Sequence, residues 1–348
     1  MTGGFAKELV DMGHEVTMYG QHIEDPNSIS SFDIQENGIK TAGLRRYKSK
    51  LFSYFLLYTY AIKYILSSEF VYFFYPTSYC YLPFICKFFR RKYGLYVRGD
   101  YNIDNKLSLT LYSNAHVVFT VAQYFTDIVN AASNKNNGHT IRPMISYTNR
   151  DVLCDRLYKR KDKYEILFLC RIDKDKGIDE LLSAAKTLIE RDIKSFHITV
   201  VGDGAYLQTV RENVSSMALE DYVAIKGQVN DEKKKKEYFM SSDIYILPTY
   251  YREGFPRTLY EAMVFGTPII TTFVSGIPSL MKDRYNCYRI QERSVNSIID
   301  AITFALGNYN QMGEFAKHAT ETVLKVLDPN RPSHAQDVNN SISVLKKR

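Results

Sequence analysis

Two acidic residues, Glu253 and Glu261, lie on either side of the start of an expected helix. A strand-like run at 244–247 precedes them, and Pro256 suits the first turn of a helix. The first backbone N–H groups of a helix have no partner inside it, and they attract anions. The segment therefore predicts an anion site at the helix start, with one carboxylate in the loop and one a turn further on.

Three residues at this helix start, Arg257, Thr258 and Leu259, are expected to present the unpaired N–H groups. A carboxylate close to a bound phosphate is repelled by it, so Glu253 and Glu261 are expected to face hydroxyl groups instead. A plainer interpretation stays open, in which Glu253 caps the helix and Glu261 pairs with Arg257. Their spacing alone does not decide, because glutamate is a common residue.

A second candidate follows the expected strand 165–170. There Arg171 has the forked donor geometry that fits phosphate oxygens, and Lys176 adds a point charge just before a helix that starts at Gly177. Loops in this position bind ligands in α/β proteins. The alternative is a solvated basic turn, because two aspartates between the cations partly neutralise it.

A third candidate is the turn Val201-Gly202-Asp203-Gly204, which follows another expected strand. Its glycines permit a tight turn and a close ligand approach. Such turns are common, so this one is a weak signal by itself.

Composition sets the class of protein. The chain has 348 residues, of which 45 % are hydrophobic, enough for two cores. Its net charge of +7 suits an anionic ligand, an anionic membrane surface or nucleic acid, and does not separate them. The five cysteines lack paired spacing, which argues against a disulfide framework or zinc site. With no signal-peptide core at the N-terminus, we expect a cytoplasmic protein.

The second half of the sequence alternates strand-like runs with helix-period segments. This alternation predicts a parallel, doubly wound α/β sheet with right-handed crossovers. The expected strands are 165–170, 197–201, 223–225, 244–247 and 269–272, and the expected helices are 178–191, 205–217, 231–240 and 257–265.

The first half repeats this pattern less regularly. The expected elements are a helix at 5–12 and strands at 14–19, 70–74, 95–97 and 116–121. A doubly wound domain has a central first strand, and a glycine turn leads from it into the first helix. Gly3 and Gly4 supply that turn with no strand before them, so we expect a domain without its first strand. A true start upstream is favoured over loss of the strand, because a sheet without its middle strand exposes two edges.

Two segments, 51–66 and 70–89, are apolar and tyrosine-rich, but lysine and proline interrupt them too often to predict a spanning helix. The stretch 79–92 ends in a basic cluster, which fits a helix on a membrane surface or, more ordinarily, a buried helix with a solvated end. The run Lys233–Lys236 offers a similar choice, with a solvated helix face as the default over contact with a membrane or partner.

The motif EGFPRTLYEAM at 253–263, with GTPIITT downstream, closely resembles the donor site of retaining glycosyltransferases of family 4. The upstream CRIDKDKG and VGDG recur at that family's positions and in its order. The similarity is strong over 165–272 and extends to 3–19 through the glycine turn, the helix and GHEV. The sequence PTYYREGFPR is similar to that of the bacterial branch that builds capsule, exopolysaccharide or lipopolysaccharide chains.

The resemblance implies a GT-B fold, with two Rossmann-like doubly wound domains facing each other across a cleft. We expect an acceptor domain at 1–150, a nucleotide-sugar donor domain at 151–328 and a C-terminal helix or tail at 329–348, with 146–163 as the connection. The implied reaction moves a sugar from a UDP- or GDP-sugar to a hydroxyl of a growing, lipid-linked surface glycan, with retention. No metal, cofactor or nucleic acid is implied, and a peripheral position at the inner membrane face is expected.

The resemblance also assigns roles to single residues. Arg171 and Lys176 match the diphosphate-binding pair, Glu253 the acid that faces the donor sugar, and Glu261 the acid that contacts the ribose. The further donor-binding positions implied are Gly4, Gly204, Gly227, Gly254, Phe255, Pro256, Arg257, Thr258 and Leu259. Of these, Gly4 matches the glycine that faces the diphosphate from the other domain, and Gly227 lies where the nucleobase pocket begins.

The sequence departs from the family pattern after the expected strand 70–74, where Tyr75-Pro76-Thr77 replaces a histidine of many relatives. A histidine contact to the donor sugar is therefore not assumed. An epimerase is disfavoured by the EGFPR loop with EAM, a phosphorylase by the absence of a cofactor-lysine motif, and a dinucleotide dehydrogenase by the lack of GxGxxG after any strand. The alternative from another class is a catalytically impaired GT-B module that binds a glycan or a partner.

Overall fold

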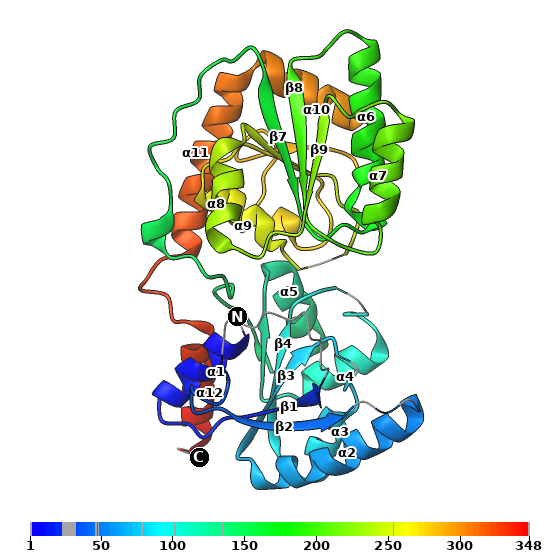
Figure 1. Ribbon diagram of the computed structural model, residues 1–348. Coiled ribbons are helices and arrows are strands. Elements are labelled where there is room, and N and C mark those ends of the chain that lie inside the picture. Colours follow the sequence, from blue (N-terminus) through cyan, green and yellow to red (C-terminus); the bar gives the residue numbers. More distant parts are fainter. Residues whose placement is uncertain are drawn as a thin grey trace. The chain divides into compact units, whose positions relative to one another are not determined.

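The computed structural model describes residues 2–22, 33–45, 47, 49–77, 79–100, 102–133, 135–252 and 254–346. The chain forms two compact units (Figure 1). Unit 1 contains Met1–Ser146 and Asn330–Arg348, and unit 2 contains Tyr147–Pro329. Unit 1 is therefore built from both ends of the chain, and unit 2 from the continuous segment between them.

Unit 2 is an α/β unit whose strands and helices alternate along the chain, as predicted. Its elements are η1 (Asn149–Asp151), β7 (Tyr164–Leu169), η2 (Lys174–Lys176), α6 (Ile178–Glu190), β8 (Phe196–Val201), α7 (Leu207–Ser216), β9 (Val223–Gly227), α8 (Glu232–Ser241), β10 (Ile244–Leu247), α9 (Arg257–Val264), β11 (Ile269–Thr271), η3 (Ile277–Ser279), β12 (Tyr288–Arg289), α10 (Val295–Gly307) and α11 (Tyr309–Val326).

The strands of unit 2 form one parallel sheet in the order β12-β11-β10-β7-β8-β9. Alternate residues of each strand point to opposite faces. Ile166 and Phe168 of β7 are fully buried in a core with Leu181 and Leu182 of α6 and Ile302 of α10. Elsewhere in unit 2, the ring of Tyr245 on β10 packs against the ring of Phe239 on α8.

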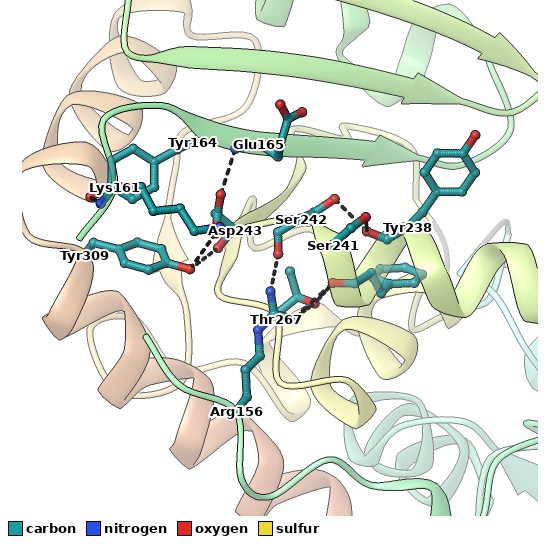
Figure 2. Close-up of polar contacts among 11 residues, drawn as sticks. Arg156, Lys161, Tyr164, Glu165, Tyr238, Ser241, Ser242, Asp243, Thr267 and Tyr309 are labelled. Atoms are coloured by element: carbon teal, nitrogen blue, oxygen red, sulfur yellow. Dashed lines mark hydrogen bonds and ion pairs between the residues drawn. The ribbon is translucent and has the colours of Figure 1, made fainter. Parts of the chain in front are cut away.

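The segment 146–163 was expected to connect the two domains, but residues 147–163 of it belong to unit 2 and are attached to it by side-chain contacts. The Arg156 guanidinium donates to the carbonyl oxygens of Phe239 at 3.0 Å and Phe265 at 3.1 Å. It also donates to the carbonyl oxygen of Ser242 (Figure 2). These carbonyls lie at the ends of α8 and α9, where helices leave such groups unpaired. One arginine therefore satisfies the ends of two helices.

A second polar group of this region centres on the buried carboxylate of Asp243, which precedes β10 (Figure 2). It pairs with Lys161 at 2.6 Å, accepts a hydrogen bond from Tyr309 at 3.2 Å and accepts another from the N–H of Glu165 at 2.9 Å. A buried charge requires such partners. The contact with Lys161 adds a further attachment of the segment 147–163 to unit 2.

Unit 1 is also α/β, with short parallel strands. Its elements are α1 (Thr2–Asp11), β1 (Thr17–His22), β2 (Lys40–Arg45), α2 (Lys50–Ser67), β3 (Phe70–Tyr75), α3 (Leu82–Phe88), β4 (Lys92–Val97), α4 (Lys106–Asn114), β5 (Val117–Thr120), α5 (Gln123–Ala132), β6 (Gly138–Thr140) and α12 (His334–Lys346). The described strands form two parallel sheets, β1-β2 and β3-β4-β5-β6.

The larger sheet of unit 1 is covered on both faces. Leu95 and Val97 of β4 point into a core formed with helices α2 to α5, while Tyr96 between them points into a second core formed with α1 and α12. In this second core, His334 of α12 forms a 2.6 Å hydrogen bond with the hydroxyl of Tyr72. Burial lowers the pKa of His334 to about 3, so this side chain stays neutral at physiological pH.

The start of unit 1 corrects one prediction. Gly3 and Gly4 were expected in a turn before the first helix, but both lie within α1, which begins at Thr2. Glycine accepts helical backbone angles as well as turn angles, at a cost of about 1 kcal/mol relative to alanine. The following strand, expected at 14–19, is β1 at Thr17–His22.

Candidate functional site

The strand order of unit 2 reverses between β7 and β10. From β7 the chain continues to β8 and β9 on one side, and from β10 it continues to β11 and β12 on the other side. In open α/β sheets, ligands bind at such a reversal, outside the carboxyl ends of the two strands. The loops after β7 and after β10 contain the predicted Arg171–Lys176 pair and the Glu253–Glu261 segment, so the fold brings these two predictions together.

Hydrogen bonds join these two loops directly. The carbonyl oxygen of Asp175, in the loop after β7, accepts from the N–H of Tyr250 at 3.0 Å and from the hydroxyl of Thr249 at 3.3 Å. The hydroxyl of Tyr250 donates to the carbonyl oxygen of Lys174 at 2.9 Å. Segments far apart in the sequence are thereby fixed against each other at the point of strand reversal.

Gly177 makes the close approach of the loops possible. Its φ of +78° lies in the left-handed region, and a Cβ atom there would lie 2.1 Å from the carbonyl oxygen of Pro248. Both the backbone angle and the space therefore require glycine. This residue was predicted only as a helix start, and its packing role is visible only in the structure.

The glycines of the third candidate, the turn after β8, also pack against the loop after β7. A Cβ atom on Gly202 would lie 1.9 Å from the carbonyl oxygen of Cys170, and one on Gly204 would lie 2.3 Å from that of Ile172. Gly227, at the end of β9, accepts a hydrogen bond from the N–H of Gly202 at 2.9 Å. The three predicted motifs of unit 2 and Gly227 thus form one continuous edge of the sheet.

The two cations of the loop after β7 have different surroundings. Lys176 is only 5 % exposed, and its Nζ lies 4.6 Å from the centre of the Tyr251 ring. Arg171 is largely exposed, and its Nε pairs with Asp173 at 2.7 Å. The sequence predicted both cations but did not indicate Tyr251, because an aromatic ring that faces a cation from another loop has no pattern along the chain.

The start of α9 differs in part from the prediction. Pro256 is the N-cap residue, with a φ of −59°, and its carbonyl oxygen accepts a hydrogen bond from the N–H of Leu259 at 3.1 Å. That N–H was expected to be unpaired, so this prediction was wrong. The first turn of α9 closes as an i to i+3 turn. Arg257 and Thr258 begin the helix as predicted.

Side chains around this helix start are held by neighbouring elements. The hydroxyl of Tyr245 on β10 donates to the hydroxyl of Thr258 at 2.6 Å. Phe255 is buried, and its ring centre lies 4.4 Å from that of Tyr260. Gly254 is buried as well. The residues from Gly254 into α9 are therefore held by packing and hydrogen bonding, as a binding site requires.

The two glutamates of the motif cannot be treated alike. Glu253 lies outside the described residues. Glu261 is on α9, and burial raises its pKa to about 7, although the positive charges of Lys235 and Arg257 oppose this rise. The negative charge of Glu232 adds to it. Glu261 therefore changes charge near neutral pH, which is unusual for a carboxyl group and frequent at functional sites.

Gly4 is the predicted site residue that lies in the other unit. It is exposed on α1, and a Cβ atom there would meet no atom within 4 Å. Its expected contact with the diphosphate stays a prediction.

Residues 150–322 match the family model described as Glycosyl transferases group 1. Unit 2 is a group 1 glycosyl transferase domain. The match covers the strand-reversal site and both of its loops, and it includes the Arg171, Lys176 and Glu261 positions.

Curated relatives are similar over about half of the chain. A protein of the cps region of Klebsiella pneumoniae is 25 % identical over 177 residues, which is 49 % of this chain and 46 % of that protein. The putative colanic acid biosynthesis glycosyltransferase WcaL of Escherichia coli is 26 % identical over 165 residues, which is 46 % of this chain and 40 % of WcaL. Each match thus spans less than half of the relative.

Solved structures are similar over nearly the whole chain. A glycosyltransferase from Rickettsia africae superposes with a TM-score of 0.74 at 16 % identity, covering 99 % of this chain and 94 % of that one. Anabaena HepE, solved in complex with UDP, gives 0.70 at 13 % identity, covering 96 % and 100 %. At such low identity these neighbours show the fold, and the fold is GT-B with two Rossmann-like units.

Proposed function

We propose that this protein is a retaining glycosyltransferase of family 4 that transfers a sugar from a UDP- or GDP-sugar to a hydroxyl of a growing surface glycan. In this proposal the acceptor is lipid-linked, the protein is cytoplasmic and peripheral at the inner membrane face, and no metal takes part. Curated relatives named for colanic, teichuronic and amylovoran biosynthesis support this acceptor class. Structural neighbours solved with UDP or UDP-glucose support the donor class.

One observation carries the proposal, namely the strand-reversal site of unit 2 with its two hydrogen-bonded loops. A nucleotide sugar has a diphosphate whose negative charge increases as the bond to the sugar breaks. Positive charges and fixed N–H donors close to that group lower the barrier. Lys176, Arg171 and the start of α9 surround the site with such groups, and a buried cation acts more strongly than one in water.

Each residue of the site then has a role. Lys176 and Arg171 bind the diphosphate, and the loop from Gly254 into α9 contacts sugar and phosphate. Glu261 accepts hydrogen bonds from the ribose hydroxyls, which its carboxylate does best when ionised. Glu253, which lies outside the described residues, is the residue that we assign to the hydroxyls of the donor sugar.

The donor site is tested by calorimetric titration with UDP and with GDP. We expect one of them to bind to the wild type, and Lys176→Ala to weaken this binding by about tenfold or more. Lys186→Ala on the exposed side of α6 is the matched control and should bind normally. If neither nucleotide binds, the protein is not a donor-dependent transferase, and the glycan- or partner-binding module becomes the better interpretation.

Transfer is tested by screening nucleotide sugars and measuring the nucleoside diphosphate released. Turnover that survives both Lys176→Ala and Glu253→Ala unchanged would contradict the proposal. The anomeric configuration of the product, read by NMR, tests retention. Turnover that persists in the presence of EDTA supports the proposed independence from metal ions.

A further inference from the structure

The outer face of α2 in unit 1 is unusual for a helix exposed to water. Its inner face is a stripe of Ser53, Leu57, Ala61 and Ile65, all buried. Residues two positions before each of these lie on the opposite side of the helix. This opposite side begins with Leu51 and Phe55, which are 84 % and 64 % exposed. A surface helix ordinarily has polar residues there.

Helix α3 extends this apolar surface. It contacts α2, and the two helices lie side by side (Figure 1). Phe88 at the end of α3 is 80 % exposed, and its ring packs edge-on against Phe89. The guanidinium of Arg91 donates to the carbonyl oxygen of Leu66 at 2.6 Å, which ties the chain after α3 to the end of α2.

We name this region the α2–α3 face. Its exposed apolar and aromatic members include Leu51, Phe52, Phe55, Leu66, Phe88 and Phe89. Large exposed apolar patches mark sites that bind a protein or a membrane. The charge around the patch decides between these two partners.

Cations dominate the sequence of this region. The basic residues between 47 and 92 are Lys48, Lys50, Lys63, Lys87, Arg90, Arg91 and Lys92, and the acidic residue is Glu69. Lysine is depleted in protein–protein interfaces. Exposed aromatic and leucine side chains beside lysine and arginine are typical of helices that lie in the headgroup region of an anionic bilayer.

We propose that the α2–α3 face is a membrane-binding surface that inserts its aromatic side chains into the headgroup region of an anionic phospholipid bilayer. Helix α2 lies in the plane of the interface, and no helix among the described residues is long and apolar enough to span a membrane. The surface gives unit 1 direct access to a lipid-linked acceptor, and in this respect the inference rests on the proposed function.

The absence of tryptophan from the sequence makes insertion directly observable. Phe55→Trp introduces a single tryptophan on the α2–α3 face, which is excited selectively at wavelengths where the tyrosines do not absorb. We expect its emission to shift to shorter wavelength with vesicles of equal parts phosphatidylcholine and phosphatidylglycerol, and to change little with phosphatidylcholine alone. Leu157→Trp, at a similarly exposed apolar position of unit 2, is the control and should not respond.

Flotation with the same vesicles measures the contribution of the side chains. The double variant Phe55→Ser with Phe88→Ser should bind these vesicles more weakly than the wild type by about tenfold or more. Lys63→Glu with Arg90→Glu should lose about thirtyfold or more, since each cation near the surface contributes severalfold. Lys233→Glu with Lys234→Glu alters the other basic run, on α8, and should bind as the wild type does.

Three results would overturn the inference: a wild type that does not bind anionic vesicles, an unresponsive Phe55→Trp, or equal loss of binding in the α8 variant. Thermal unfolding tests whether each variant is folded. We expect each variant to unfold as the wild type does, because the changed side chains are exposed. Vesicle binding needs no donor, so a protein that binds vesicles but not UDP or GDP refutes the proposed function and leaves the surface intact.

Discussion

At the scale of single residues, the ring of Tyr251 contacts Lys176 and helps to position its charge at the site. A ring that faces an ammonium group at 4.6 Å stabilises it there by about 0.5 to 2 kcal/mol. We expect Tyr251→Leu to lower kcat/KM by about three- to thirtyfold, and Tyr251→Phe to keep most of the activity because the ring remains.

The measurement is steady-state release of nucleoside diphosphate, combined with calorimetric binding of the nucleotide. Equal loss of activity in Tyr251→Phe and Tyr251→Leu would show that the hydroxyl, and not the ring, is what matters. No loss in either variant would show that Lys176 is positioned without Tyr251.

Glu261 leads to a prediction about pH. Its folded pKa of about 7 lies above the ordinary 4.5, so between these values the folded state holds a proton that the unfolded state has lost. The free energy of unfolding must therefore fall as the pH rises through this window, by roughly 3 kcal/mol in total. Glu261→Gln should remove this fall and should be more stable than the wild type above the window.

Urea unfolding at the two ends of the window checks this prediction. Glu237→Gln on the exposed side of α8 is the control and should follow the wild type.

In the active enzyme, KM for the donor should decrease as the pH rises through about 7, because the ionised carboxylate is the better acceptor for ribose hydroxyls. A KM that does not change with pH would contradict the ribose role.

Residues whose chemistry is evident from their type and local position could be predicted from the sequence. Lys176, Arg171 and Glu261 were predicted on loops or helix starts, and the structure brings these loops together. A role that depends on contact between distant segments could not be predicted. The ring of Tyr251 and the hydrogen bond that occupies the N–H of Leu259 are set by neighbouring segments and local closure. The role of Glu253 stays a prediction.

At the scale of elements, the contact between the loops after β7 and β10 depends on Gly177. Gly177→Ala forces a side chain into the left-handed region and places its Cβ 2.1 Å from the carbonyl oxygen of Pro248. We expect the free energy of unfolding to fall by about 2 kcal/mol or more, with weaker nucleotide binding as the loops separate. Urea unfolding and calorimetry measure the two effects.

Gly307 supplies the matched control for that substitution. It ends α10, and a Cβ atom there would meet no atom within 4 Å. Gly307→Ala should leave stability unchanged or increase it slightly, because alanine restricts the unfolded chain more than glycine does. If both variants behaved alike, the close packing of Gly177 would not be important for stability.

The elements of unit 2 were predicted well because β-branched runs and amphipathic helices alternate clearly there. Those of unit 1 were predicted less well. Its first strand is β1 at Thr17–His22, not 14–19, and β2 at Lys40–Arg45 was missed. Both strands lie in a small separate sheet, and their pairing depends on partners that the local sequence does not reveal.

At the scale of the whole molecule, the packing of α12 could not be predicted from the sequence. The segment 329–348 was expected as a separate helix or tail, whereas α12 packs on α1 and buries Ala335 and Val338 in a core of unit 1. The residues it contacts lie at the other end of the chain, and no local pattern records such a pairing. Unit 1 therefore depends on both termini for its stability.

This dependence predicts that a cavity in α12 weakens unit 1 selectively. Val338→Ala removes buried methyl groups from the core with α1, and Ile302→Ala removes them from the core of unit 2. Each substitution should cost about 1 to 4 kcal/mol. In hydrogen exchange, Val338→Ala should lower the protection of β3 to β5 and leave β7 to β10 unchanged, and Ile302→Ala should do the reverse. Because each unit has its own core, equal loss of protection in both units from either variant would mean that they unfold as one cooperative body.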